Sequence, residues 1–160
     1  MQILKATPTG TQTAIGLLMI RLALGAIFIA HGAQKVFTYG MGNVGDMFGE
    51  MGIPLAGVMG PVVSLFELAG GVAIILGLLT RPVSVGLAAT MLGAIFFAHL
   101  SAGFFAPDGY EFPLMLLAAA AALVSTGAGK WSVDAALEKR ATSHVGAEST
   151  ERTVAARRAA

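Results

Sequence analysis

The residues that could carry out chemistry in this sequence are a few charged and histidine side chains inside or beside long apolar runs. Glu67 lies near the middle of the run from Pro61 to Thr80. Twenty residues of helix span about 30 Å, roughly the thickness of a bilayer's hydrocarbon core. A carboxylate at that depth is costly unless it is paired, protonated or facing a wet cavity. Glu67 is therefore the first candidate for a catalytic group.

Arg21 is the second buried charge, because it interrupts the first apolar run. Measured from the predicted helix ends, Arg21 lies roughly 10 Å and Glu67 roughly 18–20 Å above the same side of the membrane. Both charges need a partner in hydrocarbon, and an arginine side chain can bridge several ångströms. We therefore predict an Arg21–Glu67 pair, direct or through water. The pair could fix the register of two helices or take part in catalysis, and the sequence leaves both open.

A second group of candidates lies near the opposite side of the membrane: His31, Lys35, His99 and Glu111. Histidine titrates near neutral pH, so histidine beside a carboxylate could pass protons during a redox step. We predict that these four residues bind a cofactor. A quinone fits best, and two histidines at similar depth leave haem as a less favoured alternative. The competing interpretation is that the histidines only form hydrogen bonds with loops. We assign no metal ligand.

These residues must be positioned by helices, and the predicted fold is an all-α membrane four-helix bundle. The apolar runs predict spans at about 14–33, 55–79, 83–103 and 112–128. Val44, Met47, Phe48 and Met51 have helical spacing, which predicts a short amphipathic outer helix between the first two spans. Asn43 with Asp46 would form its capping box. We expect one bundle domain over residues 1–134 and a mobile polar cytoplasmic tail over 135–160.

The composition supports a membrane protein and excludes several functions. Of the 160 residues, 56% are hydrophobic and only 12% are charged, about half the charged share of a soluble domain. The absence of cysteine excludes a disulfide, a cysteine-ligated iron–sulfur cluster and covalent c-type haem within this sequence. A net charge of +1 gives no reason to expect nucleic-acid binding.

The distribution of basic residues predicts the orientation in the membrane. If both termini lie on one side, that side carries eight basic residues, and the other side carries only Lys35. The eight are Lys5, Arg81, Lys130, Lys139, Arg140, Arg152, Arg157 and Arg158. Because positive charge is enriched in cytoplasmic loops, we expect both termini in the cytoplasm. Trp131 would anchor the bundle at that interface.

The ordered motifs resemble the DoxX family of small four-span membrane proteins over roughly residues 15–134. The matching residues are Arg21, Gly25, Phe28, His31-Gly32, Lys35, Glu67, Gly70-Gly71, Gly77-Leu78, Thr80-Arg81, His99, Gly109, Glu111, Gly127, Gly129, Ser132 and Asp134. The resemblance implies a four-helix bundle in the bacterial cytoplasmic (inner) membrane and a link to redox metabolism. It also implies soluble partners of the superoxide dismutase and sulfurtransferase type.

Three functions remain open on the sequence. The first is a quinone-interacting subunit that lies in the lipid bilayer and works with soluble oxidoreductases. The second is a non-catalytic membrane anchor or scaffold for a redox complex, with the basic tail as its docking segment. The third is a small transporter, because buried arginine and glutamate also mark ion or solute paths. A homo-oligomer is compatible with all three.

Overall fold

The computed structural model describes residues 9–143, and within them the chain is entirely helical, with no strand. Helix α1 (Gly10–Ala33) continues into a π-helical segment, η1 (Gln34–Tyr39), and α2 (Met41–Glu50) follows. After α3 (Ala56–Leu76), helix α4 (Thr80–Gly93) continues through π-helical η2 (Ala94–His99) and the short η3 (Leu100–Ala102). Helix α5 (Glu111–Thr126) and a final helix over 133–143 complete the fold. The predicted all-α class is confirmed.

Three of the helical stretches are long and apolar enough to cross a membrane. They are Gly10–Tyr39, Ala56–Leu76 and Thr80–Ala102. Helix α5, with 16 residues, is a shorter apolar helix, about 24 Å long. The predicted bundle is therefore present, with a short fourth member. Of the predicted tail, residues 135–143 belong to the last helix, and residues 144–160 lie outside the described part of the chain.

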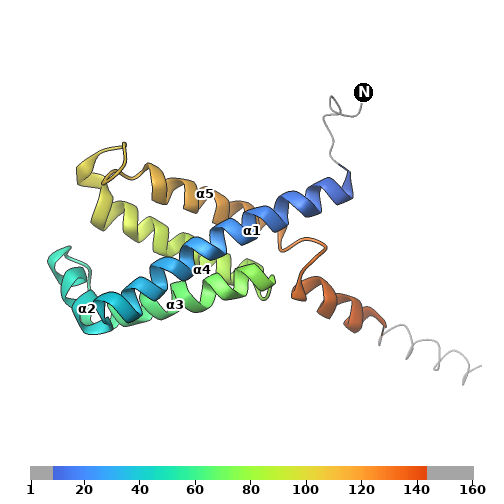
Figure 1. Cartoon of the computed structure of the whole chain (residues 1–160), viewed down its shortest axis with the longest axis horizontal. Coiled ribbons are helices and arrows are strands. Elements are labelled where there is room, and N and C mark those ends of the chain that lie inside the picture. The colour runs from blue at the N-terminus through green and yellow to red at the C-terminus, as the bar shows by residue number, and fades with distance from the viewer. Residues whose placement is uncertain (1–8, 144–160) are drawn as a thin grey trace, which may run out of the picture.

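The central pair of the bundle is α1 against α3, which run side by side in Figure 1. Glycine makes their close approach possible. A Cβ atom on Gly25 would lie 2.6 Å from the carbonyl oxygen of Gly71, and one on Gly71 would lie 2.7 Å from the oxygen of Gly25. A Cβ on Gly32 would meet the backbone of Leu68. Small residues such as Gly25 and Gly71 let the two helices approach each other closely.

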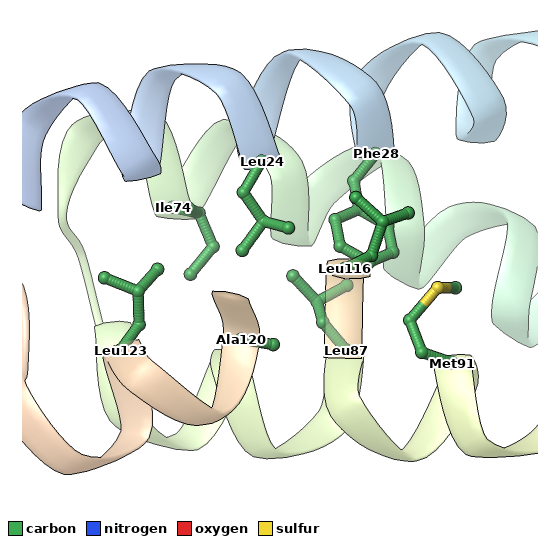
Figure 2. Packing of buried hydrophobic residues seen from close by; sticks show 8 residues of the cluster. All are labelled: Leu24, Phe28, Ile74, Leu87, Met91, Leu116, Ala120 and Leu123. Carbon is green, nitrogen blue, oxygen red and sulfur yellow. The ribbon is translucent and has the colours of Figure 1, made fainter. Parts of the chain in front are cut away.

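The hydrophobic core contains side chains from four helices, α1, α3, α4 and α5, as Figure 2 shows. It consists of Leu24 and Phe28 on α1, Ile74 on α3, Leu87 and Met91 on α4, and Leu116, Ala120 and Leu123 on α5. Because these side chains interdigitate between the helices, the helices form one packed bundle and hold the polar groups at fixed positions.

The short outer helix exists, but its predicted start is wrong. Helix α2 begins at Met41, after Gly40 with φ of 80°, so Asn43 lies inside the helix. The Asn43 side chain donates to the carbonyl of Tyr39 at 2.9 Å and does not form a capping box with Asp46. Close contact between Gly45 and Gly60 packs α2 on α3, because a Cβ on Gly60 would lie 2.8 Å from the Cα of Gly45. Helix α2 thereby covers one end of the bundle.

Candidate functional site

Arg21 does not contact Glu67, and the predicted pair is wrong. The buried Arg21 guanidinium, only 2% exposed, donates to four backbone carbonyls. Two of these, Ile74 and Ile75, belong to the last turn of α3, where carbonyls lack partners within the helix. The others are those of Ala128 and Trp131, beyond α5. Arg21 therefore joins three segments at one end of the bundle.

The depths predicted for the two charges differ by roughly 8–10 Å, and the structure keeps this separation. Ile74 lies seven residues, or about 10 Å of helix, beyond Glu67 along α3. Arg21 faces Ile74 and Ile75, so it lies about two helical turns from Glu67. The guanidinium does not bridge this gap to Glu67, because carbonyls at the end of α3 and beyond α5 satisfy it at its own depth.

Glu67 forms an ion pair with Lys35 instead. The Glu67 side chain is 4% exposed and that of Lys35 is 22% exposed, so the pair is largely enclosed by the bundle. Lys35 belongs to η1, the π-helical continuation of α1. Opposite charges in an ion pair neutralise each other, which lowers the free-energy cost of holding a carboxylate inside an apolar helix.

A cavity of about 430 Å³ adjoins this ion pair. Its polar wall includes three of the four residues predicted at this side, His31, Lys35 and His99, together with Glu67. Most of the remaining wall is apolar and comes from α2, α3, α4 and η2. Representative side chains are Met47, Phe48, Val63 and Phe97. The volume lies within the range of small-molecule binding sites, about 300–1,000 Å³.

A second chamber of about 120 Å³ shares the same polar side chains, His31, Lys35, Glu67 and His99. Its other wall is apolar and is formed by α1, α4 and α5. Phe28, Met91, Phe112, Pro113 and Leu116 contribute to this wall. The four polar side chains therefore border both spaces. Such a set of convergent polar groups in an apolar cavity is typical of a ligand-binding site.

The two histidines have different surroundings. His99 is half-buried, and its Nδ1 lies 2.7 Å from the carbonyl oxygen of Asp108. His31 is exposed at the edge of the bundle, and its ring centroid lies 6.2 Å from that of Phe112. His99 is thus fixed by a loop, whereas His31 is held only by an aromatic neighbour.

Glu111 lies outside both cavities, so the structure does not bring it to the other predicted residues. Its Oε1 accepts a hydrogen bond from the backbone N–H of Ala106 at 2.8 Å. A carboxylate in the first turn of α5 is favoured there by the helix dipole. This contact ties Glu111, the first residue of α5, to the loop that precedes its own helix.

Sequence reasoning missed three polar side chains that line the larger cavity: Gln34, Tyr39 and Thr90. Gln34 and Tyr39 lie in the same π-helical segment as Lys35, and His99 ends the other one. π-Helical turns are rare and often occur at functional sites. No pattern in the sequence marks them, although Tyr39 follows Lys35 at helical spacing. Thr90 donates to the Leu87 carbonyl at 2.8 Å, which leaves its oxygen able to accept a further bond.

No group of three His, Asp or Glu side chains comes together as a metal site within residues 9–143. The residues of the polar wall can form hydrogen bonds with a ligand in an apolar cavity. Lys35 supplies donors, Glu67 supplies an acceptor, and the histidines supply either, depending on protonation.

Comparison with known proteins identifies the family. The DoxX family model matches residues 16–100, which include Arg21, His31, Lys35, Glu67 and His99. The chain belongs to the DoxX family. The DoxX match thus covers four members of the polar wall, and Glu111 lies beyond it. No solved structure matches the chain.

Three relatives of this DoxX chain are similar over most of their length. A Bacillus subtilis protein named "Putative oxidoreductase CatD" is 38% identical over 120 residues, covering 75% of this chain and 85% of the relative. The Mycobacterium tuberculosis membrane protein Rv3486 is 35% identical over 134 residues, covering 77% and 82%. The Escherichia coli inner membrane protein YqjF is 32% identical over 130 residues, covering 79% and 95%.

Proposed function

We propose that this DoxX protein is a quinone-interacting subunit of a redox system in the bacterial inner membrane. The observation that carries the proposal is the apolar cavity of about 430 Å³ with Lys35, Glu67, His31 and His99 on its wall. The name of the Bacillus subtilis relative supports oxidoreductase chemistry, and that of YqjF supports the inner membrane.

The charges of the cavity favour a neutral ligand. The ammonium group of Lys35 is already neutralised by the carboxylate of Glu67. An anionic ligand would need to displace Glu67 from Lys35 and leave a carboxylate unpaired inside the bundle, which is costly. A quinone head group is neutral and planar, and its two carbonyl oxygens accept hydrogen bonds. It fits both the apolar wall and the donors of the polar wall.

The residues of the wall would bind the head group and manage its protons. A bound quinone supplies the redox chemistry, since it takes up two electrons and two protons to become a quinol. Lys35 would donate a hydrogen bond to one carbonyl oxygen, with Glu67 holding the ammonium in place. His99 and His31 would exchange protons with the nearby surface, because an imidazole ring can both donate and accept a proton. Electrons would come from a soluble oxidoreductase partner, including the partner types that the family resemblance implies.

Binding of a defined quinone tests this proposal. The full chain in phospholipid nanodiscs is titrated with menadione, with empty nanodiscs as the reference for partition into lipid. The test variant, Lys35→Met with Glu67→Leu, removes both charges together, so neither partner is left unpaired. The matched control is Asp46→Asn, an exposed carboxylate on α2 that does not line the cavity. Lipid extracts of the purified protein are also analysed for bound quinone by mass spectrometry.

We expect menadione to bind the native chain and the control, and to bind the double variant at least about tenfold more weakly, the equivalent of one or two hydrogen bonds to charged groups. Equal binding to all three proteins would remove the assigned role of the polar wall. Absence of both menadione binding and co-purified quinone would favour the anchor function.

A further inference from the structure

We propose that the loop over residues 103–110 fixes His99 in one tautomer, with the hydrogen on Nδ1, so that Nε2 offers a hydrogen-bond acceptor to the cavity. Glu111 is then a positioning residue that acts through this loop. The inference also names the ligand form that the site selects, a quinol hydroxyl, and that part rests on the proposed function. The tautomer itself does not depend on the function.

The contact between His99 and Asp108 determines which nitrogen carries the hydrogen. A backbone carbonyl only accepts hydrogen bonds, so the nitrogen 2.7 Å from the Asp108 oxygen must donate. In the neutral ring the other nitrogen, Nε2, then has a free lone pair. Nε2 makes no hydrogen bond with any residue in the range 9–143, and His99 lines both cavities.

The loop that carries Asp108 is held by hydrogen bonds at both ends. The N–H of Tyr110 donates to Gly103 and that of Glu111 donates to Phe104, each at 3.0 Å. In the middle of the loop, the N–H of Ala106 donates to Oε1 of Glu111. A Glu111 variant without a side-chain acceptor would release this middle part of the loop, next to Asp108.

Close packing inside the loop restricts it further. The N–H of Gly109 donates to the Phe105 carbonyl at 3.0 Å, and a Cβ on Gly109 would lie 2.5 Å from the oxygen of Phe104. The rings of Phe104 and Tyr110 meet edge to face with centroids 5.3 Å apart. The Asp108 carbonyl therefore lies in a loop with little freedom, and this fixes the orientation of the imidazole.

An acceptor at His99 and a donor at Lys35 distinguish the oxidised from the reduced ligand. A quinone has only acceptor oxygens, which suit the Lys35 ammonium but not a bare Nε2. A quinol has hydroxyl groups, and one of them can donate to Nε2. The charged groups that share the cavities with His99 are Lys35 and Glu67, which neutralise each other, and the other titratable side chain there is His31. We infer that His99 binds the reduced form.

The tautomer is tested by nitrogen NMR of the full chain, labelled with ¹⁵N-histidine, in phospholipid nanodiscs. Spectra are recorded over a series of pH values, and the tautomer is read where the imidazolium signal is absent. The signal that disappears in His99→Phe identifies His99. We expect the Nδ1–H form in the native chain, in Glu111→Gln, which keeps an acceptor oxygen, and in the control Asp46→Ala. Glu111→Ala should give a mixture of tautomers.

An Nε2–H tautomer in the native chain would overturn the proposal, and this outcome does not require any variant to fold. A folded Glu111→Ala protein with the native tautomer would overturn the role of Glu111. A merely structural role of Glu111 would lower stability without changing the nitrogen shifts of His99.

The ligand form is tested with menadiol and its dimethyl ether, which lacks hydroxyl groups, under anaerobic conditions in the same nanodiscs. One hydrogen bond corresponds to roughly a five- to tenfold preference for menadiol, and His99→Phe should abolish it. If the native chain binds both compounds equally, His99 does not select the reduced form. If neither compound nor menadione binds, the proposed function fails, whereas the tautomer result stands or falls by the NMR experiment alone.

Discussion

At the scale of single residues, the two charges inside the apolar helices are stabilised in different ways. Arg21 uses the fork of its guanidinium to bind four carbonyls at one end of the bundle. Glu67 is paired with Lys35 beside the cavity. The Arg21 hydrogen bonds hold helix ends together, and the Glu67–Lys35 ion pair borders the cavity. The structure therefore separates a structural charge from a candidate functional one.

Two double-mutant cycles test this separation. Lys35→Met and Glu67→Leu remove partners in contact, so their effects on the free energy of unfolding should be coupled by about 1–3 kcal/mol. Arg21→Met and Glu67→Leu remove groups that do not meet, so their effects should add within about 0.5 kcal/mol. Unfolding by SDS titration in mild detergent micelles supplies the free energies. Strong coupling between Arg21 and Glu67 would contradict the observed arrangement.

Arg21→Lys tests the fork itself. Lysine retains the positive charge but is a point donor and cannot reach four carbonyls on two other segments as guanidinium does. Carbonyls left without a donor cost about 1–3 kcal/mol each when buried. We therefore expect Arg21→Lys to lower the free energy of unfolding by several kcal/mol in the same titration. Stability equal to that of the native chain would mean that charge alone is sufficient at this position.

At the scale of elements, the contact of α1 with α3 depends on glycine. Gly32→Val would place a side chain against the backbone of Leu68, which cannot move without separating the helices. Overpacking of this kind costs about 1–3 kcal/mol or more. Gly16→Val on the same helix is the matched control, because nothing lies within 4 Å of its Cβ position. Thermal unfolding should distinguish the two, and equal stability would show that the helices do not need this close approach.

The cap of α4 gives a prediction for pH. Asp134 accepts from the N–H groups of Leu79 at 2.8 Å and Thr80 at 2.9 Å. Burial raises the pKa of Asp134, but the hydrogen bonds from Thr80 and Leu79 and the charge of Arg21 lower it, and the lowering prevails. A carboxylate with a lowered pKa adds stability above its ordinary pKa of about 3.9, and this stability is lost as pH falls through the folded value.

The measurement is acid unfolding followed by the fluorescence of Trp131, the single tryptophan. We expect the native chain to lose stability relative to Asp134→Asn as pH falls below about 4, because only the native chain has a carboxylate to protonate at position 134. Glu138→Gln, an exposed carboxylate one turn further along the last helix, is the control and should keep the native profile. A native pH profile in Asp134→Asn would mean that the cap does not titrate in this range.

The sequence predicted elements better than contacts. Apolar runs identified the spans, and helical spacing identified α2, because these signals extend over many residues. The partners of Arg21 include carbonyls at the end of α3, where Gly77 adopts φ of 67° and the helix stops three residues before the predicted end of the span. The pairing of Glu67 with Lys35 depended on the continuation of α1 as a π-helix, and no periodic pattern in the sequence predicts this continuation. His31, Lys35 and His99 line one cavity, whereas Glu111 binds its own loop.

At the scale of the whole molecule, the two ends of the bundle differ. One end contains the start of α1, the turn between α3 and α4, and the helix over 133–143, as Figure 1 shows. Arg21 and Asp134 join the segments there. The other end is covered by α2 and contains the cavity. The described basic residues Arg81, Lys130, Lys139 and Arg140 all belong to the first end, which the charge rule places in the cytoplasm.

Orientation decides which compartment the cavity end of the bundle faces, and reporter fusions test it. Alkaline phosphatase is active only outside the cytoplasm and green fluorescent protein only inside, so each site is fused to both. Fusions after Gly52 and Gly103, at the end that holds the cavity, should report the outside. Fusions after Arg81 and Lys130 should report the inside, because basic segments resist translocation. If the pattern is reversed at both pairs of sites, His31 and His99 would face the cytoplasm, and proton exchange would have to be assigned to that side. Consecutive helices of the bundle cross the membrane in opposite directions, so the two fusion sites at one end must report the same side. Different reports from two sites at the same end would contradict the bundle itself.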